Sequence, residues 1–280
     1  METTALEPAG LLTLLGVQDA DRDAVLALLD GPPSEGAQTA LGVLRERLGT
    51  LPGGYAPQSD VDEFGWLEAY ARFTPELLAY WEGLGIPQDI VAATLADLGR
   101  HVDINRRVFG TFGFETFGWL SLHFAGNLFQ LGRLQFHLLQ HHEDADWAEP
   151  GEWILSVHIP EGGGLSPAAV DASFAQAVEF FARHFPDQPV RSAECISWLL
   201  DPELARRVPG SNMAAFAQRF TLDRTSASPT DAVYFTFRQR GLDGLDRLPR
   251  DSSLQRAVLD HIDDGGEWGL GHGHLTLPRG

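Results

Sequence analysis

The chain has 280 residues, 44% of them hydrophobic, which is enough to build a substantial core in two domains. Its formal net charge is -19, which argues against binding to nucleic acid or to anionic membranes, because clustered basic side chains bind both. All 20 basic residues are arginines, which excludes a lysine Schiff base and any phosphate-binding loop that needs a lysine.

Cysteine usage and the first residues bear on the cellular compartment. The single cysteine, Cys195, can form neither an internal disulfide nor a cysteine-based zinc site. The chain begins METTALEPAG, with an acidic side chain at position 2 and no basic segment, unlike a signal peptide. No apolar run approaches the roughly 20 residues that cross a bilayer. We therefore expect a cytoplasmic protein.

Residues 1 to about 110 carry patterns typical of helices. An apolar cluster at 11–29 is followed by two breaks, GPPSEG at 31–36 and LPGGYAPQS at 51–59. The next segment predicts two short helices that separate near Thr74 and Pro75. A further helix follows Pro87, with an apolar stripe formed by Ile90, Val91, Leu95, Leu98 and Val102.

From about residue 131 the hydrophobic period changes. Alternating patterns predict strands at 131–140, 153–160, 192–201, 216–223, 232–239 and 267–277, with helices at about 167–184 and 252–263. Adjacent strands imply antiparallel pairing, and the strand–helix–strand unit implies a crossover. The sequence thus predicts an α+β protein, with a helical N-terminal domain at 1–125 and a mixed α/β domain at 126–280 around a central, mostly antiparallel sheet.

A glycine run joins a predicted strand to a helix in ILSVHIPEGGGLSPAAVDASF, residues 154–174. Ser166 suits the N-cap position of this helix and Pro167 its first turn. A strand, a flexible loop and a helix N-terminus together can present free N–H groups to an anion. The loop also has the features of an ordinary tight turn, and Glu161 and Asp171 place two carboxylates near any bound phosphate.

Several separated segments resemble a known family. They are TLADLGRHV (94–102), FAGNLFQLGRLQFHLL (124–139), SVHIPEGGGLSP (156–167), FFARHFP (180–186), CISWLLDPEL (195–204) and GSNMAAFAQRF (210–220). In this order they resemble bacterial two-part acyltransferases, which pair a helical N-terminal domain with a C-terminal domain similar to the GCN5-related N-acetyltransferases (GNAT).

The resemblance implies a GNAT-like C-terminal domain that uses acyl-CoA as co-substrate, with no metal. In such domains two strands diverge, the pantetheine pairs with the free strand edge, and the pyrophosphate lies on backbone N–H groups before a helix. The residues of this chain at that place are Gly162, Gly163, Gly164, Leu165 and Ser166. The resemblance also implies a late tyrosine as general acid, and Tyr234, within a predicted strand, is the only tyrosine after Tyr80.

Four residues near the glycine run are candidates for catalysis. His158 shares a strand face with Ser156 and is either a general base or a hydrogen-bonded structural histidine. Cys195 and Ser197 share one face of the strand expected beside it, so either could form a covalent acyl intermediate with help from His158. A buried cysteine that packs as a hydrophobe is the alternative. Glu194, on the other face, is a competing general base.

Other residue groups leave several interpretations open. Two clusters contain possible metal ligands, one at His141, His142, Glu143, Asp144 and Asp146 and one at His261, Asp263, Asp264, His272 and His274. Aromatic residues near the domain junction favour an interdomain core, with a substrate pocket as the alternative: Phe109, Phe112, Phe114, Phe117, Trp119 and Phe124. Candidates for binding a phosphate or carboxylate are Arg106, Arg107, Arg133, Arg206, Arg207 and Arg219.

The sequence favours an acyltransferase that moves an acyl group from acyl-CoA to an amine or hydroxyl of a small-molecule acceptor. A non-catalytic module that binds CoA or another small molecule on the same fold is a second hypothesis. A metal-dependent hydrolase that uses the histidine clusters is a third.

Overall fold

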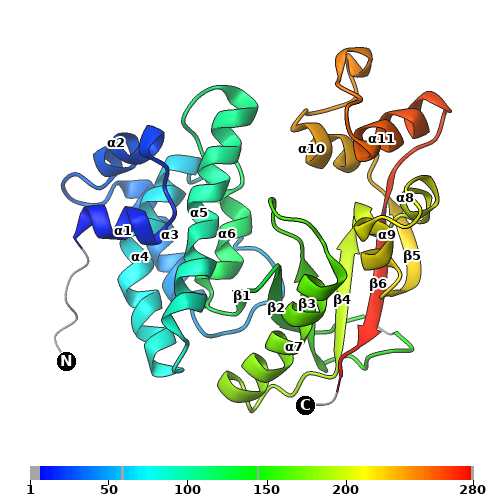
Figure 1. The fold of residues 1–280 in the computed structure, drawn as a ribbon. Coiled ribbons are helices and arrows are strands. Elements are labelled where there is room, and N and C mark those ends of the chain that lie inside the picture. Colours follow the sequence, from blue (N-terminus) through cyan, green and yellow to red (C-terminus); the bar gives the residue numbers. More distant parts are fainter. Residues whose placement is uncertain (1–6, 58–59, 144, 279–280) are drawn as a thin grey trace. The chain divides into compact units, whose positions relative to one another are not determined.

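The computed structural model describes residues 7–57, 60–143 and 145–278. The chain divides into two compact units. The first consists of residues 1–131 and 137–140, and the second of residues 132–136 and 141–280. Helices dominate the first unit, and a sheet with covering helices forms the second (Figure 1). The α+β fold class predicted from the sequence is confirmed.

The first unit contains six helices within the described residues. They are α1 (Pro8–Leu14), α2 (Asp19–Leu28), α3 (Glu35–Arg47), α4 (Glu63–Gly83), α5 (Gln88–Phe109) and α6 (Phe117–Phe124). Ser34 caps α3 through a hydrogen bond from the Ala37 amide, and Asp62 caps α4 through one from the Gly65 amide. Capping side chains of this kind explain where both helices begin.

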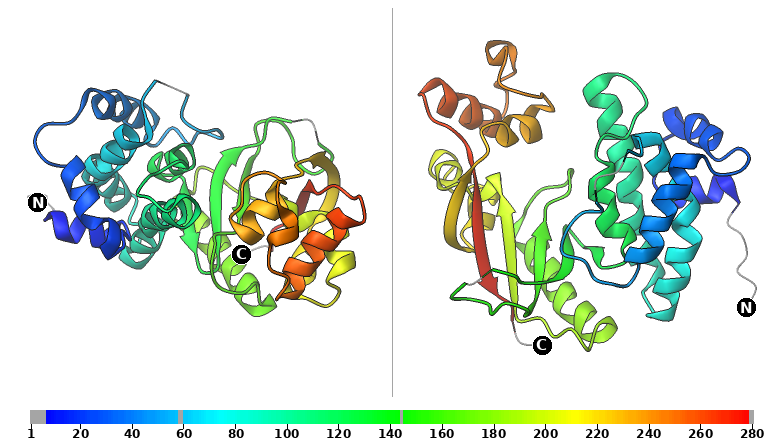
Figure 2. Two further views of the ribbon diagram at one scale, coloured as in Figure 1. Left: turned by 90° about the horizontal axis from the view of Figure 1, so that it is seen from above. Right: turned by 180° about the vertical axis from the view of Figure 1, so that it is seen from behind.

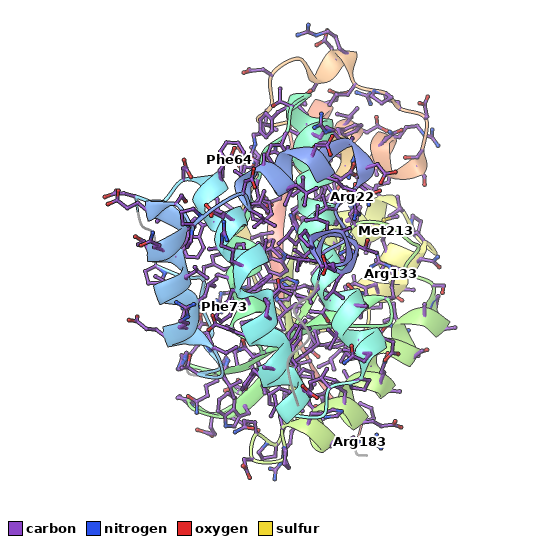
Figure 3. The ribbon with its side chains drawn as sticks, turned by 90° about the vertical axis from the view of Figure 1, so that its left-hand side faces the viewer. Arg22, Phe64, Phe73, Arg133, Arg183 and Met213 are labelled. Atoms are coloured by element: carbon purple, nitrogen blue, oxygen red, sulfur yellow. The ribbon has the colours of Figure 1, made fainter. Side chains whose placement is uncertain are left out.

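The prediction of two helices around Pro75 is wrong, because α4 continues through this residue. Proline removes one backbone hydrogen bond from a helix, but burial of the large side chains on both sides compensates for that loss. Trp66, Tyr70, Phe73 and Trp81 are all nearly inaccessible to solvent. Figure 3 labels Phe73 among the side chains of this unit.

The aromatic residues at 112–124 belong to the core of the helical unit. Their rings pack mainly against α4, through the pairs Phe112–Phe64, Phe114–Tyr70, Phe117–Trp66 and Phe124–Tyr70. Phe109 is half exposed. These ring contacts account for most of the cluster without a ligand pocket.

The sheet has six strands, in the order β1-β2-β3-β4-β6-β5. The strands are β1 (Leu128–Leu131), β2 (Leu134–Gln140), β3 (Trp153–His158), β4 (Ser192–Ser197), β5 (Thr221–Ala227) and β6 (Gly269–Thr276). β3 and β4 run parallel, joined by the crossover helix α7 (Pro167–His184), and β6 pairs antiparallel with both β4 and β5. The last strand of the chain therefore lies inside the sheet.

Short helices follow β4 and β5 in the second unit. They are α8 (Pro202–Arg207), α9 (Asn212–Ala217), α10 (Asp231–Phe237) and α11 (Ser253–Asp263), with 3-10 turns at Trp198–Leu200 and Leu245–Arg247. Figures 1 and 2 show α10 and α11 beyond the end of the sheet toward which β4 points. No helix among the residues described is long and apolar enough to span a membrane.

Several strand predictions differ from this structure. The strand predicted at 192–201 ends at Ser197, because Trp198–Leu200 form a 3-10 turn, and the segment predicted as one strand at 131–140 is divided between the end of β1 and β2. Most of the strand predicted at 232–239 belongs to α10 (Asp231–Phe237), which buries Ala232 and Val233 and contacts α11. Aromatic and β-branched residues favour strands locally, but this packing outweighs that preference. The strand predicted at 216–223 begins only at Thr221, because α9 occupies the preceding residues.

Candidate functional site

The parallel strands β3 and β4 separate toward their carboxyl ends. Their paired residues are Leu155 with Ala193 and Ser156 with Glu194, whereas β3 continues to His158 and β4 to Ser197. On its other side β4 stays paired with β6 as far as Ser197. Among the described residues, the last three of β4 therefore have no β3 partner in this register, as a ligand that pairs with the strand edge requires.

The glycine loop follows β3 at this end of the sheet. Gly162 and Gly163 have φ angles of +91° and +65°, a left-handed conformation that glycine adopts without strain. Ser166 ends the loop as N-cap of α7 and accepts a hydrogen bond from the Ala169 amide at 3.3 Å. Within the described part of the chain, the amides at 162–166 donate no hydrogen bond to a protein atom.

Three arginines from distant parts of the chain surround this loop. Arg133 donates hydrogen bonds to the carbonyls of Gly164, at 3.2 Å, and Gly163, at 3.4 Å. Arg238, which follows α10, forms an ion pair with Glu161, and Arg219 forms one with Asp171 on the first turns of α7. The two carboxylates near the loop are thus paired with cations, which reduces their repulsion of a bound anion.

The other arginines proposed from the sequence are engaged elsewhere. Arg106 pairs with Asp21, Arg107 with Asp103, and Arg206 and Arg207 with Glu203. Sequence reasoning named Arg133 and Arg219 without ranking them, and it missed Arg238. Arg238 was missed because the sequence pattern at residues 232–239 predicts a strand, whereas this residue follows the helix α10.

One face of the sheet next to the loop is polar. Glu194 lies opposite Ser156 on β3 and His274 on β6, so the three side chains form a row across the sheet. His158 lies two residues after Ser156 and therefore on the same face, at the point where the strands diverge. Ile196 lies beside it on this face and is half exposed, so the surface there is open to solvent within this unit.

Burial affects the acid–base behaviour of Glu194. The carboxyl group is largely removed from water, which raises its pKa above the usual glutamate value. The electrostatic interaction with His141 and a hydrogen bond with Ser156 lower this pKa and so act in the opposite direction. A carboxylate with a raised pKa is a stronger base, as a proton acceptor near neutral pH requires.

Cys195 and Ser197 lie on the opposite face from His158. Strand alternation separates them from Glu194, and Cys195 is fully buried opposite Gly273 on β6. Burial raises the pKa of its thiol, which keeps the weakly nucleophilic protonated form. The Ser197 hydroxyl accepts a hydrogen bond from the Leu199 amide at 3.2 Å, which caps the following 3-10 turn. Neither residue is positioned to pair with His158.

The histidine clusters form other contacts. His274 Nδ1 lies 2.9 Å from Asp223 Oδ1, and its ring stacks on Trp147 with a centroid distance of 5.0 Å. His272 Nε2 lies 2.8 Å from Ser226 Oγ. Asp144, one of the proposed ligands, falls outside the described residues. Among those that are described, no group of three or more His, Cys, Asp or Glu side chains could hold a metal ion.

Tyr234 lies on α10 and not on a strand as predicted. Two guanidinium groups lie over its ring, that of Arg238 at 5.3 Å and that of Arg240 at 5.2 Å from the centroid. The ion pair of Arg238 with Glu161 links this helix to the glycine loop. Tyr234 is therefore close to the loop although it is 70 residues away in sequence.

Two family models match the chain along nearly its whole length. The N-acyltransferase N-terminal domain matches residues 7–126, and the GNAT-like C-terminal domain matches residues 128–275. The chain belongs to the N-acyltransferases with a GNAT-like C-terminal domain. The family resemblance and the GNAT-like fold expected from the sequence are confirmed.

Solved structures of acyltransferases are similar to this N-acyltransferase family member over most of their length. One, in complex with decanoyl-CoA and teicoplanin, is 31% identical with a TM-score of 0.84, covering 97% of this chain and 88% of the other. An acyltransferase in complex with CoA and 10C-teicoplanin, and an acyltransferase mutant in complex with octanoyl-CoA, are each 30% identical with TM-scores of 0.85 and the same coverage. No curated protein matches the chain.

Proposed function

We propose that this protein transfers an acyl group from acyl-CoA to an amine or hydroxyl of a small molecule. One observation carries the proposal: unbonded loop amides and paired arginines lie where β3 and β4 diverge. A diphosphate is recognised by N–H groups at a helix N-terminus and by arginines, and a pantetheine chain can pair with the free edge of β4. We assign donor binding to Gly162, Gly163, Gly164, Leu165 and Ser166.

The donor we favour is a medium-chain acyl-CoA. Similar acyltransferases have been solved with octanoyl-CoA and decanoyl-CoA. The acceptor we favour is an amine, because residues 7–126 match the N-acyltransferase N-terminal domain. A similar acyltransferase was crystallised with the small molecule teicoplanin.

The reaction we propose is direct attack of the acceptor on the thioester carbonyl. His158 lies beside the point where the strands diverge and takes the proton from the attacking nitrogen or oxygen. The carbonyl carbon becomes tetrahedral, backbone N–H groups at the ends of the strands stabilise its oxyanion, and the C–S bond then breaks to release CoA thiolate. The thiolate takes up the proton that His158 removed, so that the products are the acylated acceptor and CoA.

Two other residues lie near the proposed site of this chemistry. Glu194 is the second choice as base, because it shares the face of His158 and burial raises its pKa. Cys195 is buried on the other face, so we assign it no covalent intermediate. A direct transfer needs no nucleophile from the protein.

Binding and turnover test the proposal in two steps. Isothermal calorimetry with CoA, acetyl-CoA and octanoyl-CoA should show binding to the full chain, and absence of heat at millimolar ligand would count against any CoA-dependent role. Release of free CoA thiol should then depend on both octanoyl-CoA and an added amine or alcohol from a small panel. Binding without thiol release across the panel would favour the non-catalytic alternative.

A further inference from the structure

The ion pair between Arg238 and Glu161 joins α10 to the glycine loop. Arg238 Nη2 lies 3.1 Å from Glu161 Oε1, and Arg238 Nε lies 3.3 Å from the same oxygen. The guanidinium also lies over the rings of Tyr234, at 5.3 Å, and Phe235, at 5.6 Å. Only 15% of the Arg238 side chain is exposed, so its charged group is held at the loop and is not free in solvent.

The backbone at Arg238 is in a conformation that arginine rarely adopts. Its φ and ψ angles are 56° and 30°, and its amide donates a hydrogen bond to the Tyr234 carbonyl at 2.8 Å to close α10. Glycine is the usual residue at a left-handed helix end, because it has no Cβ to clash. An arginine there is explained if its guanidinium has a function that glycine cannot supply.

Glu161 immediately precedes the loop amides proposed to bind a diphosphate. Carboxylate and phosphate oxygens accept the same charge-assisted hydrogen bonds from a guanidinium. A carboxylate beside a diphosphate repels it, so Glu161 would weaken diphosphate binding unless a nearby cation offsets its charge. Arg238 forms an ion pair with this carboxylate.

We propose that Arg238 binds the diphosphate of the acyl donor and that Glu161 holds its guanidinium at the loop until the donor arrives. The guanidinium changes its acceptor from the carboxylate to phosphate oxygens, so Glu161 competes with the donor and sets its affinity. The inference rests on the proposed function and adds a donor-binding residue from α10, together with one residue that weakens binding.

Opposite effects are expected from removing the two side chains. Arg238→Gly suits the left-handed backbone, so folding is retained, and CoA should bind about 10- to 100-fold more weakly, as for loss of a hydrogen bond to a charged group. Glu161→Gln should tighten CoA binding about two- to fivefold, the scale of a partly exposed ion pair. The double variant should bind more tightly than Arg238→Gly alone, because the side chain at position 161 then carries no negative charge that repels the diphosphate.

The experiment measures Kd by calorimetry for CoA, dephospho-CoA and the octanoyl thioester of pantetheine. The effect of Arg238→Gly should be equal for CoA and dephospho-CoA, which share the diphosphate, and absent for the pantetheine thioester, which lacks it. Arg45→Gln is the matched control, since it removes an arginine from the exposed ion pair with Glu76 on the helical unit. It should leave all three affinities unchanged.

Three results would overturn the inference. They are an unchanged CoA affinity in Arg238→Gly, an equal loss for the pantetheine thioester, or weaker CoA binding in Glu161→Gln. Failure of the proposed function looks different, because the wild-type chain itself would then bind none of these ligands.

Discussion

At the scale of single residues, position on the sheet decides which side chains can take part in acyl transfer. His158, Ser156 and Glu194 share a face because Ser156 pairs with Glu194 and side chains alternate along a strand. The same alternation places Cys195 on the other face, where it is buried. β4 therefore carries a candidate base, Glu194, next to an inert thiol, Cys195.

Replacing His158 tests the proposed general base. We expect His158→Ala to lower kcat about 10²- to 10⁴-fold, the usual contribution of a positioned base, while Kd for octanoyl-CoA changes little. Single-turnover thiol release separates the chemical step from binding. If Glu194 is the base instead, Glu194→Gln will show the large loss and His158→Ala will not.

Cys195→Ala is the matched control for that experiment. The removed group is small and buried, so the free energy of unfolding should fall by about 1 kcal/mol, while kcat stays within a fewfold of wild type. Loss of all turnover in a folded Cys195→Ala variant would instead support an acyl-cysteine intermediate.

Residue-level prediction from sequence succeeded where the signal was local. Alternation assigned His158 and Ser156 to one face, and pairing of the β3 and β4 strands follows from the crossover helix between them. The arginines around the loop come from positions 133, 219 and 238, and no local pattern links them to residues 161–171. Long-range contacts of this kind depend on the assembled fold.

At the scale of elements, the unit β3–glycine loop–α7 was predictable because each part has its own signal. Alternating apolar residues mark the strand, and Ser166 and Pro167 mark the start of the helix. α10 was not predictable in the same way, because its aromatic and β-branched residues favour a strand and only its packing against α11 makes it a helix. In α4, too, tertiary packing outweighs a local preference, because the helix continues through Pro75.

Gly164 provides a test of close ligand approach to the loop. Its φ lies outside the left-handed range, and a Cβ built there meets no atom within 4 Å. We therefore expect Gly164→Ala to change the free energy of unfolding by less than about 0.5 kcal/mol, yet to weaken CoA binding about tenfold or more by crowding the diphosphate. Calorimetry and thermal unfolding measure the two effects.

Gly42→Ala is the control for that substitution. Gly42 lies inside α3, and a Cβ there also meets no atom within 4 Å. Alanine should stabilise this helix by about 0.5–1 kcal/mol without altering CoA affinity. Equal CoA affinity in Gly164→Ala and wild type would show that no ligand comes close to the loop.

At the scale of the whole molecule, composition and element order were sufficient for the fold class but not for the sheet order. The change of period near residue 131 marks where the helical segment gives way to the segment that contains β2 to β6 and their covering helices. Placement of β6, the last strand, between β4 and β5 has no signature in its own residues. This placement brings His274 into the row with Glu194, so part of the candidate site could be known only from the structure.

The most direct test of the account is a crystal structure of the full chain with CoA bound. We predict diphosphate oxygens within hydrogen-bonding distance of amides at residues 162–166 and of the Arg238 guanidinium, with the pantetheine running along the free edge of β4. CoA bound at another place, with the loop amides still lacking a ligand, would contradict the account.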